Sequence, residues 1–168
     1  MLASTAVLAL LMSDASARDF DIPNPASNRY FYLPSAIPVE KGSGHLSQKE
    51  LAWSSGVVGL TENVDLRLDS WYFLSFVGGL QVGTELGDTG VWFGAGAQVG
   101  VLEADFGGLA YVNYTIGSRD SNATVAFGQQ CWFTAEVGCL ANSFVVLAGQ
   151  LRLWERGALV TENWVFLK

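Results

Sequence analysis

One pair of residues in this sequence has the types and the spacing of an ester-hydrolysing site. His45 and Ser47 are separated by one residue, so they would point to the same side of a β-strand. A histidine can accept the serine proton while the oxygen attacks an ester carbonyl, and a carboxylate orients the imidazole. Glu162 is the only carboxylate that we can nominate, and no spacing places it nearby. Because one matched spacing is weak evidence, we expect no catalysis and interpret His45 as a rim or turn histidine.

The two cysteines, Cys131 and Cys139, are the other residues with reactive side chains. In an oxidising compartment they could close a small loop through a disulfide, and elsewhere they would be two buried thiols. Together with the single histidine of the chain they do not supply the three or four ligands of a zinc site. We therefore expect no metal and no other cofactor.

The residues from Val64 to Asp69 alternate strictly between apolar and charged types. As a strand, this stretch would place Val64, Leu66 and Leu68 on one face and the three charged residues on the other. The same alternation recurs over 91–101, 108–117 and 143–154, where the second face carries glycine, glutamine, asparagine or arginine. These strands must therefore have one apolar face and one small or polar face.

A barrel built from such strands would hold its polar face in the lumen. The expected lumen network contains Asp65, Arg67, Asp69, Gln98, Asn113, Gln150, Arg152 and Glu162. Because buried charges must pair, we predict that Arg67 and Arg152 contact carboxylates across the lumen. Binding of a ligand or an ion by Asp65, Arg67 and Asp69 is the alternative interpretation. The glycines at 94 and 96 are predicted to make room for large lumen side chains, because no helix follows them to help bind phosphate.

Composition limits the classes of function. The 168 residues suffice for one domain, half of them are apolar, and only 15% are charged, where about 25% is usual in soluble domains. The net charge of −7 argues against nucleic acid as a partner, because phosphate binding needs clustered lysine and arginine.

The chain divides into three parts. Residues 1–17 resemble a signal peptide, with an apolar run followed by a small-x-small cleavage pattern, although no basic residue precedes Arg18. Residues 18–44 form a lead-in that holds all four prolines and the aromatic run Tyr30–Tyr32, which we expect to plug the barrel end or pack as a hydrophobic staple. Residues 45–168 alternate period-two runs with short turns, which predicts a β-barrel domain.

The predicted fold class is all-β, an antiparallel up-and-down meander barrel of about eight strands. The strands are expected near 46–60, 64–75, 79–86, 91–102, 108–117, 122–132, 143–154 and 158–167. Eight strands leave an interior that side chains nearly fill, so a wide pore is not expected.

Three features favour lipid over water outside this barrel. The polar face is rich in glycine and amides rather than lysine and glutamate, and the six tryptophans tend toward strand ends, which would suit aromatic girdles. Strands of about 12 residues tilted by about 40° rise about 30 Å, which is enough to cross a hydrocarbon core. The alternative is a soluble barrel or sandwich with Val64, Leu66 and Leu68 inside.

Short motifs near both ends of the chain add a resemblance. They are Asn28–Phe31, Pro34–Ala36, Lys41–Gly44, Thr61–Asn63 and Ala158–Trp164. Through them the chain resembles a family of uncharacterised outer-membrane β-barrel-like proteins of Gram-negative bacteria, over about residues 22 to 164. The resemblance implies an exported, barrel-like fold and no particular activity. Family members tend to be longer and outer-membrane barrels commonly end on an aromatic residue, whereas this sequence ends on Lys168, so closure at the C-terminal end is left open.

The sequence thus predicts an outer-membrane protein, in contact with membrane lipid, with a structural or narrow-conduit role in the envelope. Three alternatives stay open. They are a secreted or periplasmic soluble barrel that binds an apolar ligand, an outer-membrane lipid hydrolase built on His45 and Ser47, and a subunit of a larger envelope assembly.

Overall fold

The structure is a computed structural model in which part of the chain is described. The described residues are Asn24, Tyr30 and 32–49, 53–71, 75–102, 105–134, 138–155 and 157–167. The signal-peptide-like residues 1–17 and Phe31 of the aromatic run lie outside them.

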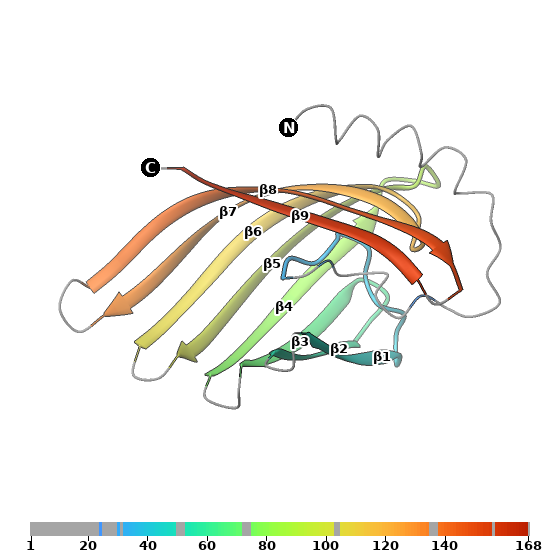
Figure 1. Cartoon of the computed structure of the whole chain (residues 1–168). Coiled ribbons are helices and arrows are strands. Elements are labelled where there is room, and N and C mark those ends of the chain that lie inside the picture. Colours follow the sequence, from blue (N-terminus) through green and yellow to red (C-terminus); the bar gives the residue numbers. More distant parts are fainter. Residues whose placement is uncertain are drawn as a thin grey trace.

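The described residues form one antiparallel sheet of nine strands in sequence order, curled into an open half-barrel (Figure 1). The strands are β1 (Gly44–Lys49), β2 (Trp53–Gly59), β3 (Val64–Trp71), β4 (Ser75–Glu85), β5 (Val91–Leu102), β6 (Asp105–Gly117), β7 (Ser121–Thr134), β8 (Gly138–Trp154) and β9 (Gly157–Leu167). The predicted all-β meander is confirmed, and the described part contains no helix. β1 and β9 are the two edges of the sheet.

The strand count differs from the prediction by one. The predicted strand 46–60 is two strands, because β1 ends at Lys49, β2 begins at Trp53, and the two pair with each other. The residues between them include no glycine, proline or asparagine, so the sequence carried no turn signal there. β6 also begins earlier than the predicted start at residue 108, at Asp105, so Gly107 lies inside a strand.

The two faces of the sheet separate by residue type as the alternation predicts. Asp65 and Arg67 are buried on the concave side, at 0% and 1% exposure, while Leu68 is 62% exposed. Every strand contributes exposed large apolar side chains, among them Leu46, Val58, Leu68, Leu80, Val99, Val112, Phe127, Leu147 and Val165. The inward position that the soluble alternative requires for Leu68 is therefore not found.

Glycines on the concave side leave space for bulky neighbours. A Cβ at Gly83 would collide with the carbonyl oxygen of Ala36, which belongs to the lead-in. A Cβ at Gly96 would collide with the ring of Tyr111, and one at Gly128 with the ring of Phe144. The inward glycines therefore determine how closely aromatic rings and the lead-in approach the sheet, in line with the role predicted for Gly96.

A matched pair of glycine variants on β4 tests this. Gly83→Ala should lower the free energy of unfolding by about 1–3 kcal/mol, because the new methyl group meets backbone that cannot move aside cheaply. Gly78→Ala is the control, since its Cβ would lie at an ordinary 3.5 Å from a Leu68 methyl group. Urea unfolding followed by tryptophan fluorescence measures both, and equal stability of the two variants would contradict the prediction.

Candidate functional site

The lead-in does not stay outside the sheet but occupies its concave side. We call residues 32–41, together with Tyr30, the plug. Leu33 to Val39 are all buried against the sheet, whereas Lys41 is exposed where the chain turns into β1 (Figure 1). Pro34 and Pro38 lack an N–H group, so this extended segment has fewer backbone donors to satisfy in a buried place. The expectation was that the aromatic run Tyr30–Tyr32 plugs the barrel end. Of this run Tyr30 is buried and Tyr32 is 48% exposed, and the proline-containing stretch that follows fills most of the concave side.

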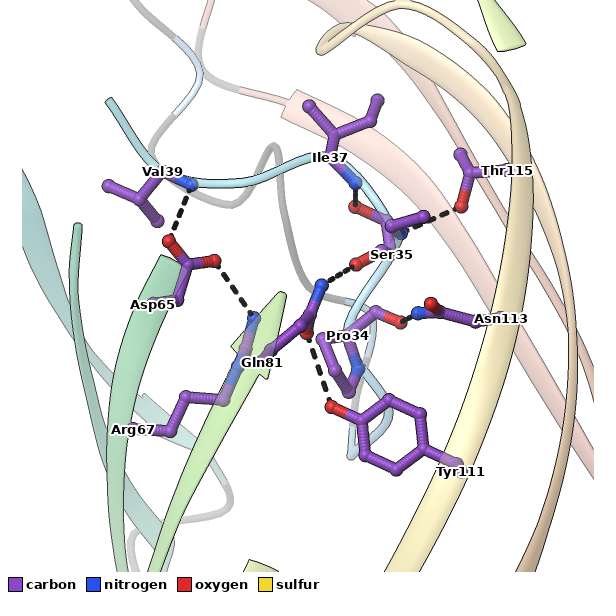
Figure 2. A network of polar contacts seen from close by, with 11 residues as sticks. Pro34, Ser35, Ile37, Val39, Asp65, Arg67, Gln81, Tyr111, Asn113 and Thr115 are labelled. Atoms are coloured by element: carbon purple, nitrogen blue, oxygen red, sulfur yellow. Dashed lines mark hydrogen bonds and ion pairs between the residues drawn. The ribbon is translucent and has the colours of Figure 1, made fainter. Parts of the chain in front are cut away.

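Side chains of β3, β4 and β6 hold the plug by its backbone (Figure 2). The Val39 N–H donates to the Asp65 carboxylate at 2.9 Å, and the Asn113 amide donates to the Pro34 carbonyl at 2.8 Å. The Ala36 N–H donates to the Thr115 hydroxyl at 2.8 Å. These side chains replace the neighbouring strand that an extended segment would otherwise need.

Gln81 on β4 links the plug to Tyr111 on β6. Its amide N–H donates to the Ser35 carbonyl, and its amide oxygen accepts a hydrogen bond of 3.2 Å from the Tyr111 hydroxyl (Figure 2). Gln81 was not among the expected lumen residues, although its position on the polar parity of β4 would have indicated it.

The start of the plug is held by the strands on the other side of the half-barrel. The Glu162 carboxylate on β9 accepts the N–H groups of Tyr32 at 2.9 Å and Leu33 at 3.2 Å, as well as the Trp164 indole N–H at 2.6 Å. The buried Tyr30 hydroxyl bonds to the side chains of Asn122 and Thr124 on β7. Glu162 is therefore a plug-binding residue.

Both buried arginines contact a carboxylate, as predicted, and the carboxylates of these two contacts lie beside the arginines in the sheet rather than across the lumen. Arg67 lies 4.0 Å from Asp65, two positions away on its own strand. Arg152 donates to Asp120 at 2.9 Å, and Asp120 belongs to the turn between β6 and β7. Both carboxylates are local partners. Asp65 lies on the same strand as Arg67, and Asp120 lies beside the end of β8, so the short aspartate side chains are within reach of the arginines.

The expected lumen residues thus divide into separate groups. Asp65, Asn113 and Glu162 bind the plug, and Arg67 accompanies Asp65. Arg152 lies at the end of β8 beside Asp120. Asp69 and Gln98 line a cavity that the plug does not fill.

This cavity has a volume of about 450 Å³. It lies between the plug and the sheet, at the ends of the strands opposite the turns at 60–63 and 86–90. It is bounded by Tyr32 and Leu33 of the plug and by Trp53, Trp132 and Trp164 of the sheet. The predicted outward girdle is therefore wrong for these three tryptophans. Their strand-end positions suggested a girdle, but their parity along the strands places them on the inner side.

Burial changes the acidity of one plug residue. Desolvation raises the pKa of Tyr30 far above its ordinary value. The hydrogen bond with Thr124 lowers this pKa by a smaller amount, and the negative charge of Glu162 adds the smallest effect, which raises it. The neutral phenol is therefore the form that fits between the plug and β7.

The remaining sequence candidates lie on β1, β7 and β8. Cys131 on β7 and Cys139 on β8 are joined by a disulfide, with 5.5 Å between their Cα atoms. His45 and Ser47 share one side of the edge strand β1, both half-buried. Among the described residues no cluster of histidine, cysteine and carboxylate side chains could hold a metal ion, and no helix is long and apolar enough to cross a membrane.

Comparison of the chain with protein-family models, with curated proteins and with solved structures gave no match.

The raised pKa of Tyr30 makes the seating of the plug dependent on pH. Because the folded pKa lies above the ordinary value of about 10, the stabilising contribution is complete below about pH 10 and is lost as the pH rises beyond it. At about pH 11 the folded wild type and Tyr30→Phe should show equal tyrosinate absorbance, because Tyr30 stays neutral.

Unfolding in denaturant at the same pH should then reveal one additional tyrosinate in the wild type. An additional tyrosinate already present in the folded protein would show that Tyr30 is open to solvent. The other tyrosines are common to both proteins and cancel in the comparison.

Proposed function

We propose that this chain is an outer-membrane β-barrel-type protein of a Gram-negative envelope, with a structural role and a lumen occupied by its own N-terminal segment. The observation that carries the proposal is the continuous apolar convex face opposite a buried polar concave face. In water such a face would be an exposed apolar surface far larger than soluble monomers usually tolerate. In lipid it is the expected outer surface.

Strand length supports the same conclusion. β4 to β9 have 11 to 17 residues each. An 11-residue strand tilted by about 40° rises about 28 Å, close to the thickness of a hydrocarbon core. Strands of soluble proteins are usually about half as long.

The plug argues against an open conduit. It crosses the concave side from β9 to β3, and its backbone is bonded to both strands and to β4 and β6 between them. Solute passage along this half of the lumen would require these bonds to break. A structural role therefore fits the described residues better than transport.

The open edges favour one further candidate, a subunit of a larger envelope assembly. In lipid the backbone groups of β1 and β9 need partners, and the described residues provide no pairing between these two strands. Nine antiparallel strands leave β1 and β9 pointing in the same direction. Closure by antiparallel pairing therefore requires an odd number of additional strands, from this chain or from a partner.

Fractionation followed by electrophoresis is the first experiment. We expect the protein in the membrane fraction and a band in SDS whose mobility changes on boiling, because closed barrels resist SDS until heated. A soluble protein without a mobility shift would refute the membrane proposal.

A lysine pair tests the convex face directly. Leu80 lies mid-strand on β4 and Leu86 in the turn that follows, and the two are equally exposed, at 51% and 52%. In lipid, Leu80→Lys should cost about 2–4 kcal/mol of stability, while Leu86→Lys outside the strand costs about 0–1 kcal/mol. In water both changes would be nearly neutral, within about 0.5 kcal/mol. Urea unfolding from lipid vesicles separates the two environments.

A further inference from the structure

The floor of the cavity beside the plug is made of glycine and tryptophan. One row of neighbours crosses β4 to β7 through Val77, Gly100, Gly107 and Trp132, and all four line the cavity. A Cβ at Gly107 would collide with the six-membered ring of Trp132, so the indole lies against this glycine, where a side chain would otherwise be. The two adjacent glycines therefore open the cavity and leave Trp132 as an aromatic surface within it.

Gln98 adds an amide beside this floor. It lies on β5 between Gly79 on β4 and Leu109 on β6, and a Cβ at Gly79 would collide with its Cγ, so the side chain extends over Gly79. Gln98 is only 9% exposed and lines the cavity, yet its amide has no hydrogen-bond partner among the described residues. A buried amide in this position needs a partner, and the cavity is where one can be placed.

Gln130 supplies a second amide. It precedes Trp132 by two positions on β7, so both side chains point to the same side, and both line the cavity. In the part of the chain that the structure describes, the Gln130 amide also has no hydrogen bond. Asp69 lines the cavity too, but it has an interaction of its own, so the site is defined here by the two amides and the rings.

These groups select a class of ligand. An amide presents a donor and an acceptor side by side, and it pairs with a ring edge that carries an acceptor next to a donor. The face of an indole stacks with another planar ring. A sugar would bring more hydroxyl groups into a mostly apolar cavity than two amides can satisfy, and a purely apolar molecule would leave both amides unpaired.

Charge narrows the class further. The lining drawn from the described residues includes no lysine, arginine or histidine, so the phosphate of a nucleotide would be buried without a cation. A neutral heterocycle carries no such cost. The volume of about 450 Å³ falls in the range of small-molecule sites and accommodates a bicyclic ring.

We propose that this cavity binds a neutral, planar heteroaromatic molecule whose edge carries a hydrogen-bond donor next to an acceptor, as a purine base does. The ring stacks on Trp132, and its polar edge pairs with the Gln98 amide. A binding site goes beyond the structural role proposed above. It depends on the concave side only, so it holds whether lipid or water covers the convex side.

Three purines of nearly equal shape test the polar edge. The probes are 9-methyladenine, with an amino group beside a ring nitrogen, and 9-methylhypoxanthine, with a carbonyl beside an N–H group. The control is 6,9-dimethylpurine, which has a methyl group in place of the amino group. The full chain in an uncharged detergent is titrated with each purine and followed by calorimetry and tryptophan fluorescence. We expect at least one probe to bind about tenfold more tightly than the control, because a site built to hydrogen-bond a group rejects the analogue that lacks it.

Two glutamine variants locate the amide. Gln98→Met keeps the length of the side chain and removes the amide, so it should weaken binding of the tighter probe about tenfold and leave the dimethylpurine unchanged. Gln129→Met is the control, since Gln129 is exposed on β7 and does not line the cavity. Trp132→Leu removes the ring face and should weaken the probe and the dimethylpurine alike.

Each other result would overturn the proposal. Equal affinity of all three purines would leave a merely apolar cavity, and absence of binding by both probes would leave no site of this class. Equal binding of the tighter probe by Gln98→Met and the wild type, or equal weakening by Gln129→Met, would remove the role of Gln98. If Trp132→Leu does not fold, as judged by near-ultraviolet circular dichroism, the three purines and the two glutamine variants still decide the question.

Discussion

The structure depends on hydrogen bonds between the extended backbone of the plug and the buried polar side chains of the concave face. An extended backbone such as residues 32–41 needs partners for its amide and carbonyl groups when it is buried. The polar side chains on the concave face need partners for the same reason. Asp65, Asn113, Thr115 and Glu162 meet both requirements at once. Removal of either side leaves the other with buried, unsatisfied groups, so the plug and the polar lumen form one unit.

Much of the sheet could be predicted because its information is local. Alternation with period two identifies a strand and its faces from adjacent residues, and it placed Asp65, Arg67 and Asp69 on the buried side. The predicted turn at residues 61–63 likewise lies between β2 and β3. The break between Lys49 and Trp53 was missed because residues 50–52 include no glycine, proline or asparagine to mark it.

The site was harder to predict, because its contacts join distant parts of the sequence. Parity showed that Asn113 and Glu162 face inward, but not that their partners are backbone groups of the lead-in, 79 and 129 positions away. Parity also could not show that the plug covers only part of the lumen and leaves a tryptophan-lined cavity. That division depends on where Gly83, Gly100 and Gly107 allow close approach, which is a property of the assembled sheet.

The bond between Tyr32 and Glu162 also sets an order of events during folding. It spans 130 positions, so the plug acquires this partner only after β9 has joined the sheet. Contacts this distant in sequence carry a large loop-closure entropy and form late. A nascent chain that stops before β9 would therefore have the plug contacts of β3, β4, β6 and β7 but not those of Glu162. Complete binding of the plug therefore indicates that β9 has joined the sheet.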